Sequence, residues 1–306
     1  MFKTIATWAG RALALAALVF LALAARRNWA ALGAWHPSVE ALAIIAGAGV
    51  AYGVALLLVA ESWHQLVSSR NAGLPRTVTL PSYGVTQVAK YLPGNVFHYF
   101  GRHMWLARLG IAHQQLAGAV LCETILLATA ALTCATGIAL IAPPGAHLVL
   151  GWDVRDALPL ALFAIFALVG LLAALPRLGA RLKKLTLPRP ASLLRAGAVL
   201  LLFFLIQGSL FSFLFVAVGR APMLEAIGIA SISWLIGFLT PGAPGGVGSR
   251  ELVLLALVGP LLGTGNALIV AALFRIVTVA GDCVCLGLSL LIARWAPSPQ
   301  TEAAPI

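Results

Sequence analysis

Long apolar segments recur along the whole chain, and each is long enough to form a helix across a membrane. The six segments lie near residues 9–25, 39–60, 115–141, 157–175, 193–218 and 266–292. Lipid offers the backbone no hydrogen-bond partner, so segments of this kind satisfy their amide groups by forming α-helices. Apolar residues make up 61% of the 306 residues and charged residues only 9%, far less charge than a soluble domain carries. The sequence therefore predicts an all-α polytopic membrane protein.

Two further apolar stretches are broken by proline and glycine, and they lie near residues 78–100 and 223–263. The first break contains Pro93 and Gly94, and the second contains Pro241 and Gly242 at the start of the turn PGAPGGVGSRE. Proline and clustered glycines interrupt a helix. The backbone groups that they free cannot face lipid, so such a break must be buried in protein or line a watery cavity. The two breaks are therefore the first candidates for a functional site.

The two breaks belong to an internal repeat. Each Pro-Gly pair is followed at the same distance by an arginine, Arg102 or Arg250, and the two patterns are 148 residues apart. The first three apolar helices precede the last three by about the same distance, which divides the chain into halves of about 9–145 and 157–293. If both broken stretches are re-entrant, each half crosses the membrane three times and the second half is inverted relative to the first. The alternative is that each broken stretch crosses completely, giving eight or nine spans.

The repeat and the basic residues together define the expected organisation. One transmembrane domain is expected over residues 1–298, with a disordered tail over 299–306. The linker between the halves, from Pro176 to Arg195, is rich in lysine and arginine and should be cytoplasmic, which places both termini in the cytoplasm as well. The apolar run before residue 26 could alternatively be a cleaved signal peptide, although a retained first helix is the favoured interpretation.

A helix that restarts after a break presents free N–H groups and the positive end of its dipole, which suit phosphate or carboxylate. In the second half the restart near Gly248 puts Arg250 in the first turn, with Glu251 beside it. In the first half Asn95 is a candidate N-cap, and His98 and Arg102 then share one face with Trp105. The predicted ligand-binding residues are Lys90, Asn95, His98, Arg102, Gly246, Gly248, Ser249, Arg250 and Glu251.

Each of these residues also has a structural interpretation. Arg102 could extend to the membrane interface, Arg250 could pair with Glu251, and Trp105 could be an interfacial anchor. His98 could be a buried histidine with ordinary hydrogen bonds. No single residue decides between these interpretations.

Three charged residues lie well inside predicted membrane helices, away from their ends, where ionisable groups are costly enough to be functional candidates by default. Glu123 lies in the third helix, and Arg275 and Asp282 lie in the last. A buried charge needs a partner, so we expect Glu123 to form an ion pair with either Arg102 or Arg275 across the repeat axis. Glu123 and Asp282 are also candidate proton carriers.

The sequence contains no signature of an enzyme, a metal site or a cofactor site. A P-loop, a G-x-S-x-G turn, an H-E-x-x-H helix and clustered carboxylates are all missing. The four cysteines lie in apolar runs and are assigned no chemistry. The net charge of +11 is attributed to membrane topology rather than to nucleic-acid binding.

Several of these segments together resemble a known family. YLPGNVFHYFGRHMWLARLGI, VLCETILL, PGAPGGVGSRE and FRIVTVAGD are similar in order and spacing to the lysylphosphatidylglycerol synthase transmembrane region, the flippase-like domain family. The resemblance covers about residues 10 to 295, and the P-G-G-x-G-x-R-E turn is its most specific part. It implies a bacterial inner-membrane protein that acts on lipids. Since the sequence ends at Ile306 without an aminoacyl transferase domain, we do not expect synthase activity.

The expected function is therefore transport of an anionic-headed lipid between leaflets, with no enzyme activity and no cofactor. The lipid could be a phospholipid, a polyprenyl-phosphate-linked lipid or a hopanoid-type lipid. Two alternatives stay open: an accessory subunit of a lipid-modifying complex, and a transferase acting on a lipid-linked phosphate or sugar. Membrane lipids are the expected partners, with a lipid-modifying enzyme as a further candidate.

Overall fold

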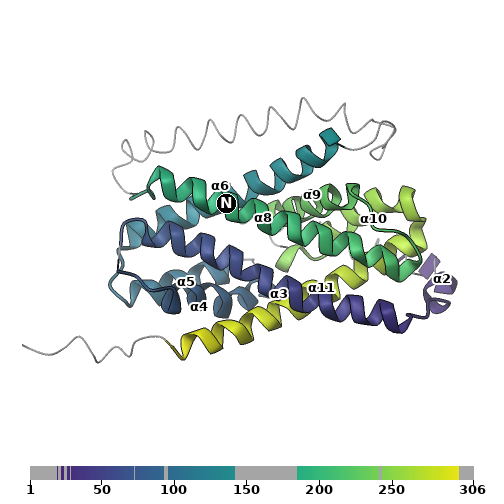
Figure 1. Ribbon diagram of the computed structural model, residues 1–306, viewed down its shortest axis with the longest axis horizontal. Coiled ribbons are helices and arrows are strands. Elements are labelled where there is room, and N and C mark those ends of the chain that lie inside the picture. The colour runs from purple at the N-terminus through teal and green to yellow at the C-terminus, as the bar shows by residue number, and fades with distance from the viewer. Residues whose placement is uncertain are drawn as a thin grey trace, which may run out of the picture.

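The computed structural model describes residues 29–71, 73–92, 96–141, 185–240 and 243–295, with five isolated positions before residue 29. In these ranges the chain is helical and contains no strand (Figure 1). The elements in chain order are α2 (Trp29–Gly33), α3 (Val39–Ser68), α4 (Arg76–Gln87), η1 (Val88–Tyr91), α5 (Phe97–Ala107), α6 (His113–Ile141), α8 (Pro190–Phe213), η2 (Leu214–Val218), α9 (Glu225–Leu239), η3 (Pro244–Gly246), α10 (Ser249–Leu262) and α11 (Thr264–Ala293).

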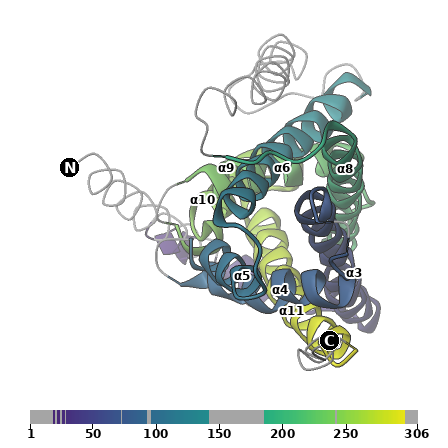
Figure 2. The ribbon, with the colours of Figure 1, turned by 90° about the vertical axis from the view of Figure 1, so that its left-hand side faces the viewer.

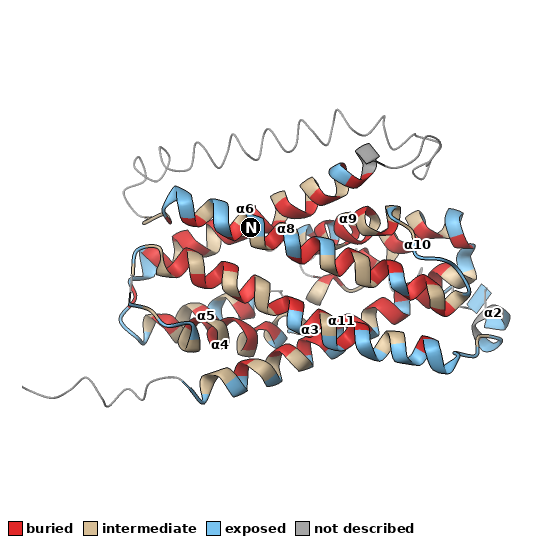
Figure 3. Ribbon diagram, viewed as in Figure 1, coloured by how far each residue is buried: buried red, intermediate tan, exposed pale blue. Residues whose placement is uncertain are grey.

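Four helices in the described ranges are long and apolar enough to cross a membrane, as the sequence predicts: α3, α6, α8 with η2, and α11. Large apolar side chains on these helices are exposed, including Val50, Leu202 and Ile276. Figure 3 shows the exposed residues of the helices in pale blue. Exposed apolar faces of this extent are typical of contact with lipid rather than water. The protein is therefore an all-α membrane protein. The predicted helix 157–175 and the predicted tail 299–306 lie outside the described residues, as does the predicted helix 9–25 apart from three isolated positions.

Each broken stretch forms a pair of short helices that pack against each other. The first pair is α4 with η1 and α5, and the second is α9 and α10, joined through η3. The longest of these helices, α9, has 15 residues and is about 22 Å long, because an α-helix rises 1.5 Å per residue. Figure 1 shows α4 and α5 at one end of the bundle and α9 and α10 at the other.

The two breaks meet in the interior of the bundle. η1 packs against η3, and a Cβ atom built on Gly245 would lie 3.0 Å from Cε1 of Tyr91. Gly245 and Gly246 have φ values of 56° and 72°, a left-handed conformation that glycine adopts without strain. Pro93, Gly94, Pro241 and Gly242, the predicted helix breaks, lie outside the described residues.

The described helices of the two halves correspond in order, and the matched long helices α3 and α8 run antiparallel. Nε of Arg70, just after α3, donates to the carbonyl oxygen of Leu187, just before α8, at 3.1 Å. At the other end, Nε1 of Trp35 donates to the carbonyl oxygen of Ala217 at 2.8 Å. α4 of the first half packs on α11 of the second, and α9 of the second half packs on α6 of the first. Figure 2, which looks along the helices, shows α3 and α8 side by side at one edge.

Two glycines let α3 and α11 approach closely. A Cβ atom on Gly281 would lie 2.4 Å from Cδ1 of Tyr52 and 2.9 Å from the backbone nitrogen of Gly53. We expect Gly281→Ala to destabilise the protein by about 1–3 kcal/mol, because the added methyl group overpacks a backbone contact. Gly287→Ala on the same helix is the control, since nothing lies within 4 Å of its Cβ position. Thermal unfolding in detergent should show a lower Tm for the first variant only; equal Tm values would contradict the close contact.

Candidate functional site

A cavity of about 80 Å³ lies where the two breaks meet. It has room for several water molecules, because one water needs about 10–15 Å³. Elements of both halves line it: η1, α5 and α6 from the first, and η3, α10 and α11 from the second. Four cationic side chains face it, from Lys90, Arg102, Arg250 and Arg275.

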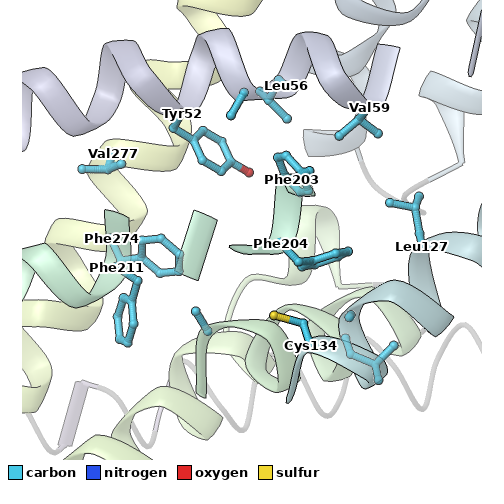
Figure 4. Close-up of a cluster of buried hydrophobic side chains, with 14 of the residues drawn as sticks. Tyr52, Leu56, Val59, Leu127, Cys134, Phe203, Phe204, Phe211, Phe274 and Val277 are labelled. Atoms are coloured by element: carbon cyan, nitrogen blue, oxygen red, sulfur yellow. The ribbon is translucent and has the colours of Figure 1, made fainter. Parts of the chain in front are cut away.

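The apolar part of the cavity lining comes mainly from α3, α8 and α9. Leu56 and Val59 lie on α3, Phe203 on α8, and Trp234 and Phe238 on α9. Tyr52 packs against Phe203 with 6.0 Å between ring centroids (Figure 4). The rings of Trp234 and Phe238 stack at 4.8 Å. The cavity lining thus combines cationic with aromatic and aliphatic side chains, as an amphiphilic ligand requires.

Arg102 pairs with Glu123 inside the bundle. Both nitrogens of the guanidinium fork donate to the carboxylate, with 2.9 Å between Nη1 and Oε1. The two side chains are 1% and 0% exposed. Their pairing is one of the two alternatives predicted for Glu123, but it lies within the first half and not across the repeat axis, because Arg102 on α5 faces Glu123 on the adjacent helix α6.

Aromatic rings surround the Arg102 guanidinium. Its centre lies 4.2 Å from the ring of Trp63, 4.7 Å from that of Tyr99 and 5.1 Å from that of Tyr83. Cation–π contacts of this kind gain strength where water is excluded. They hold the arginine at the cavity and prevent it from extending to the membrane interface, which was the structural interpretation of this residue.

Lys90 and Asp282 form an ion pair that joins the halves. Nζ of Lys90, in η1, donates to Oδ1 of Asp282, on α11, at 2.7 Å, and the hydroxyl of Tyr91 donates to the other carboxylate oxygen. Asp282 is buried, and Lys90 is 17% exposed. The predicted coupling residue Asp282 is thus connected directly to the first break.

Arg275 holds the second break in place. Its Nη1 donates to the carbonyl oxygen of Gly245 at 3.0 Å and lies 3.7 Å from Oε1 of Glu251. The same guanidinium lies 5.5 Å from the ring centroid of Tyr91, in the first break. Arg275 therefore satisfies a backbone carbonyl that the broken helix leaves free.

The start of α10 is capped by residues of its own first turn. Oε2 of Glu251 accepts the N–H of Gly248 at 2.7 Å, and the hydroxyl of Ser249 donates to the carbonyl oxygen of Gly246 at 3.3 Å. Of the predicted ligand-binding residues in this turn, Gly246 and Arg250 line the cavity, whereas Gly248, Ser249 and Glu251 do not. The carboxylate at the third helical position caps the helix, so Glu251 supports the turn.

Arg250 has no anionic partner among the residues that the structure describes. Its side chain is 7% exposed, and its guanidinium lies over the ring of Phe274 at 4.5 Å. Its Nη2 is buried without a hydrogen-bond partner in the described ranges, and no ion pair with Glu251 forms. A cation in the first helical turn also lies at the unfavourable end of the helix dipole. This arginine is therefore the strongest candidate in the site for an anionic ligand.

Two other polar atoms at the cavity also lack partners within the described chain: Nδ1 of His98 and Nε of Arg102. Buried polar atoms normally have partners, so three such atoms on one cavity indicate a place where a ligand or water binds. Trp105 is half-buried and does not line the cavity. Asn95, the predicted N-cap of α5, lies outside the described residues.

The four tyrosines were missed by the sequence analysis. The chain contains only Tyr52, Tyr83, Tyr91 and Tyr99, and all four line this cavity. Their restriction to residues 52–99 of a long apolar chain was an available signal, because a buried tyrosine hydroxyl needs a polar neighbour. In the described part of the chain, no three histidine, cysteine or acidic side chains come together as a metal site would require.

Comparisons of the chain with protein-family models, with curated proteins and with solved structures gave no match.

Proposed function

We propose that the protein moves an anionic-headed lipid between the two leaflets of a bacterial inner membrane, without enzymatic chemistry and without a cofactor. One observation carries the proposal: a buried cationic cavity at the meeting point of two helix breaks contains Arg250, a cation without an anionic partner in the described chain. A buried charge is tolerable when an ion of opposite sign joins it. A lipid headgroup that carries a phosphate meets this need.

The proposed topology has six membrane helices and two re-entrant hairpins in an inverted repeat. The short helices support it, since about 22 Å for α9 falls short of the roughly 30 Å hydrocarbon core. The antiparallel course of α3 and α8, with the hairpins at opposite ends of the bundle, supports the inversion (Figure 1). The same helix lengths disfavour eight or more complete spans. On this topology both termini are cytoplasmic. We also propose, from the resemblance of its motifs, that the chain is a member of the flippase-like domain family.

The apolar part of the lining favours a lipid over a soluble anion. Phe203, Trp234 and Phe238 line the cavity together with the cationic side chains, so a bound headgroup would have apolar surface beside it for its chains. Movement of one half against the other would alternate access to the two leaflets, as in inverted-repeat transporters. The Lys90–Asp282 ion pair crosses between the halves, which makes Asp282 the favoured coupling carboxylate.

The alternative functions have less support. A transferase needs a free carboxylate near the break as a general base. The two carboxylates considered for this role are occupied, Glu251 as a helix cap and Glu123 by Arg102. An accessory subunit would keep its partner enzyme in the membrane and would not move lipid itself.

Reconstitution tests the proposal. Purified protein in liposomes that contain a trace of fluorescent phosphatidylglycerol should speed the lipid's transfer between leaflets, measured by loss of fluorescence to a membrane-impermeant quencher. For variants of the cavity arginines, Arg195→Gln is the matched control and should transfer lipid like the wild type, because Arg195 is an exposed arginine on α8 that does not line the cavity. Failure to accelerate phosphatidylglycerol, phosphatidylethanolamine and a polyprenyl phosphate above protein-free liposomes would refute a transport function.

A further inference from the structure

The charges around the cavity do not cancel. Three of its four cations have an acidic partner: Arg102 with Glu123, Lys90 with Asp282, and Arg275 with Glu251. Arg250 is the fourth, and it has none among the described residues. With histidine counted as neutral, the remaining polar lining is uncharged, from the tyrosines, Gln87 and Thr278. The described residues of the site therefore carry one excess positive charge.

The buried position of Arg250 means that this excess charge affects which anions can bind. The side chain is buried over Phe274 and reaches the cavity that both halves share, so water and distant ions screen it weakly. In a low-dielectric setting, an anion of charge −1 restores neutrality, whereas an anion of charge −2 leaves one negative charge without compensation. A ligand with two negative charges should therefore bind less tightly than a ligand with one.

We infer that the cavity selects a headgroup whose phosphate carries a single negative charge, as a phosphodiester does, over a phosphate monoester or a diphosphate. The inference rests on the proposed function and narrows its substrate class. Both oxygens of a phosphodiester that carry the charge can accept from N–H groups, and Nη2 of Arg250 and Nε of Arg102 are buried donors that lack an acceptor in the described chain. Such charge-assisted bonds are among the strong ones in proteins.

Two lipids that differ by one charge test the inference. Phosphatidylmethanol is a phosphodiester with one negative charge, and phosphatidic acid with the same chains is a monoester that carries up to two, since the second pKa of a simple phosphate monoester is about 6. With fluorescent forms of both in the liposome assay at pH 8, the protein should move phosphatidylmethanol at least about tenfold faster. Equal acceleration, or faster movement of phosphatidic acid, would overturn the charge rule while leaving transport intact.

A variant that changes the balance by one charge provides the second arm. Glu251→Gln removes a negative charge next to Arg275 and keeps an amide oxygen that can accept the Gly248 N–H, so the helix cap is retained. The excess becomes two positive charges, and the ratio of rates should shift toward phosphatidic acid by about tenfold or more. Asp282→Asn changes the balance in the same way at the other pair, so it replaces Glu251→Gln if that variant does not fold. An unchanged ratio in a folded variant contradicts the inference.

Soluble anions distinguish a lipid headgroup from a soluble phosphate as the ligand of the cavity. Dimethyl phosphate carries one charge and has no chains, and inorganic phosphate at pH 8 carries nearly two. Weak inhibition of lipid movement by millimolar dimethyl phosphate supports a lipid ligand with the proposed charge. Strong inhibition by dimethyl phosphate but not by phosphate supports the charge rule with a soluble ligand. Strong inhibition by inorganic phosphate contradicts the charge rule. If the protein moves no lipid even when no inhibitor is present, the proposed function itself is refuted.

Discussion

Replacing Arg250 by methionine should slow lipid movement strongly and leave the protein at least as stable as the wild type. Loss of a buried charged contact costs about 2–5 kcal/mol of binding, so the rate of lipid transfer should fall by at least about tenfold. Stability should not fall, because the cation has no acidic partner in the described chain and lies in the first turn of α10, where the helix dipole disfavours it. Methionine keeps an apolar contact with Phe274.

Lipid transfer in liposomes and thermal unfolding in detergent measure the two halves of this prediction. Substitution of a buried, uncompensated charge by an apolar side chain of similar length is commonly neutral or stabilising by about 1–4 kcal/mol. A clear drop in Tm would mean that Arg250 is a structural residue with a partner in the folded protein. Normal lipid transfer would mean that the excess charge has no role in headgroup binding.

The sequence predicted the all-α fold and its long apolar helices because the signals for them are local. Proline and glycine between apolar runs mark the breaks without knowledge of any contact, and the run lengths predict α3, α6, α8 and α11 directly. The spacing that relates Arg102 to Arg250 also selected two residues that line one cavity. These inferences need only the length, periodicity and order of segments.

The pairing of charges could not be predicted because it depends on how helices pack. Glu251 is adjacent to Arg250 in the chain, yet consecutive residues point to different faces of a helix, and the carboxylate reaches the Gly248 N–H and Arg275 instead. Glu123 had two candidate partners, and only the packing of α5 on α6 selects Arg102. The excess charge at the cavity follows from these pairings, so it becomes visible only in three dimensions.

Breaking the Arg102–Glu123 pair should be the most destabilising single change in the site. Glu123→Leu leaves a guanidinium that is 1% exposed without its counter-ion, and removal of one partner from a buried pair costs about 3–5 kcal/mol. The double variant Glu123→Leu with Arg102→Met should recover most of this loss, because no charge is then buried alone and methionine can pack against Trp63 and Tyr99. Thermal unfolding of both single variants and the double variant gives the coupling energy.

The same double variant separates structure from charge selection. Removal of a cation together with its own counter-ion leaves the balance of the cavity unchanged, with Arg250 as the single excess charge. Lipid transfer by the double variant should therefore stay closer to wild type than transfer by Arg250→Met, although both lose a cavity arginine. The double variant also loses the Nε donor of Arg102, so if the two variants lose transfer equally, that donor matters as much to headgroup binding as the charge balance does. If the single and double variants are equally unstable, the Arg102–Glu123 pair does not hold the first break against α6.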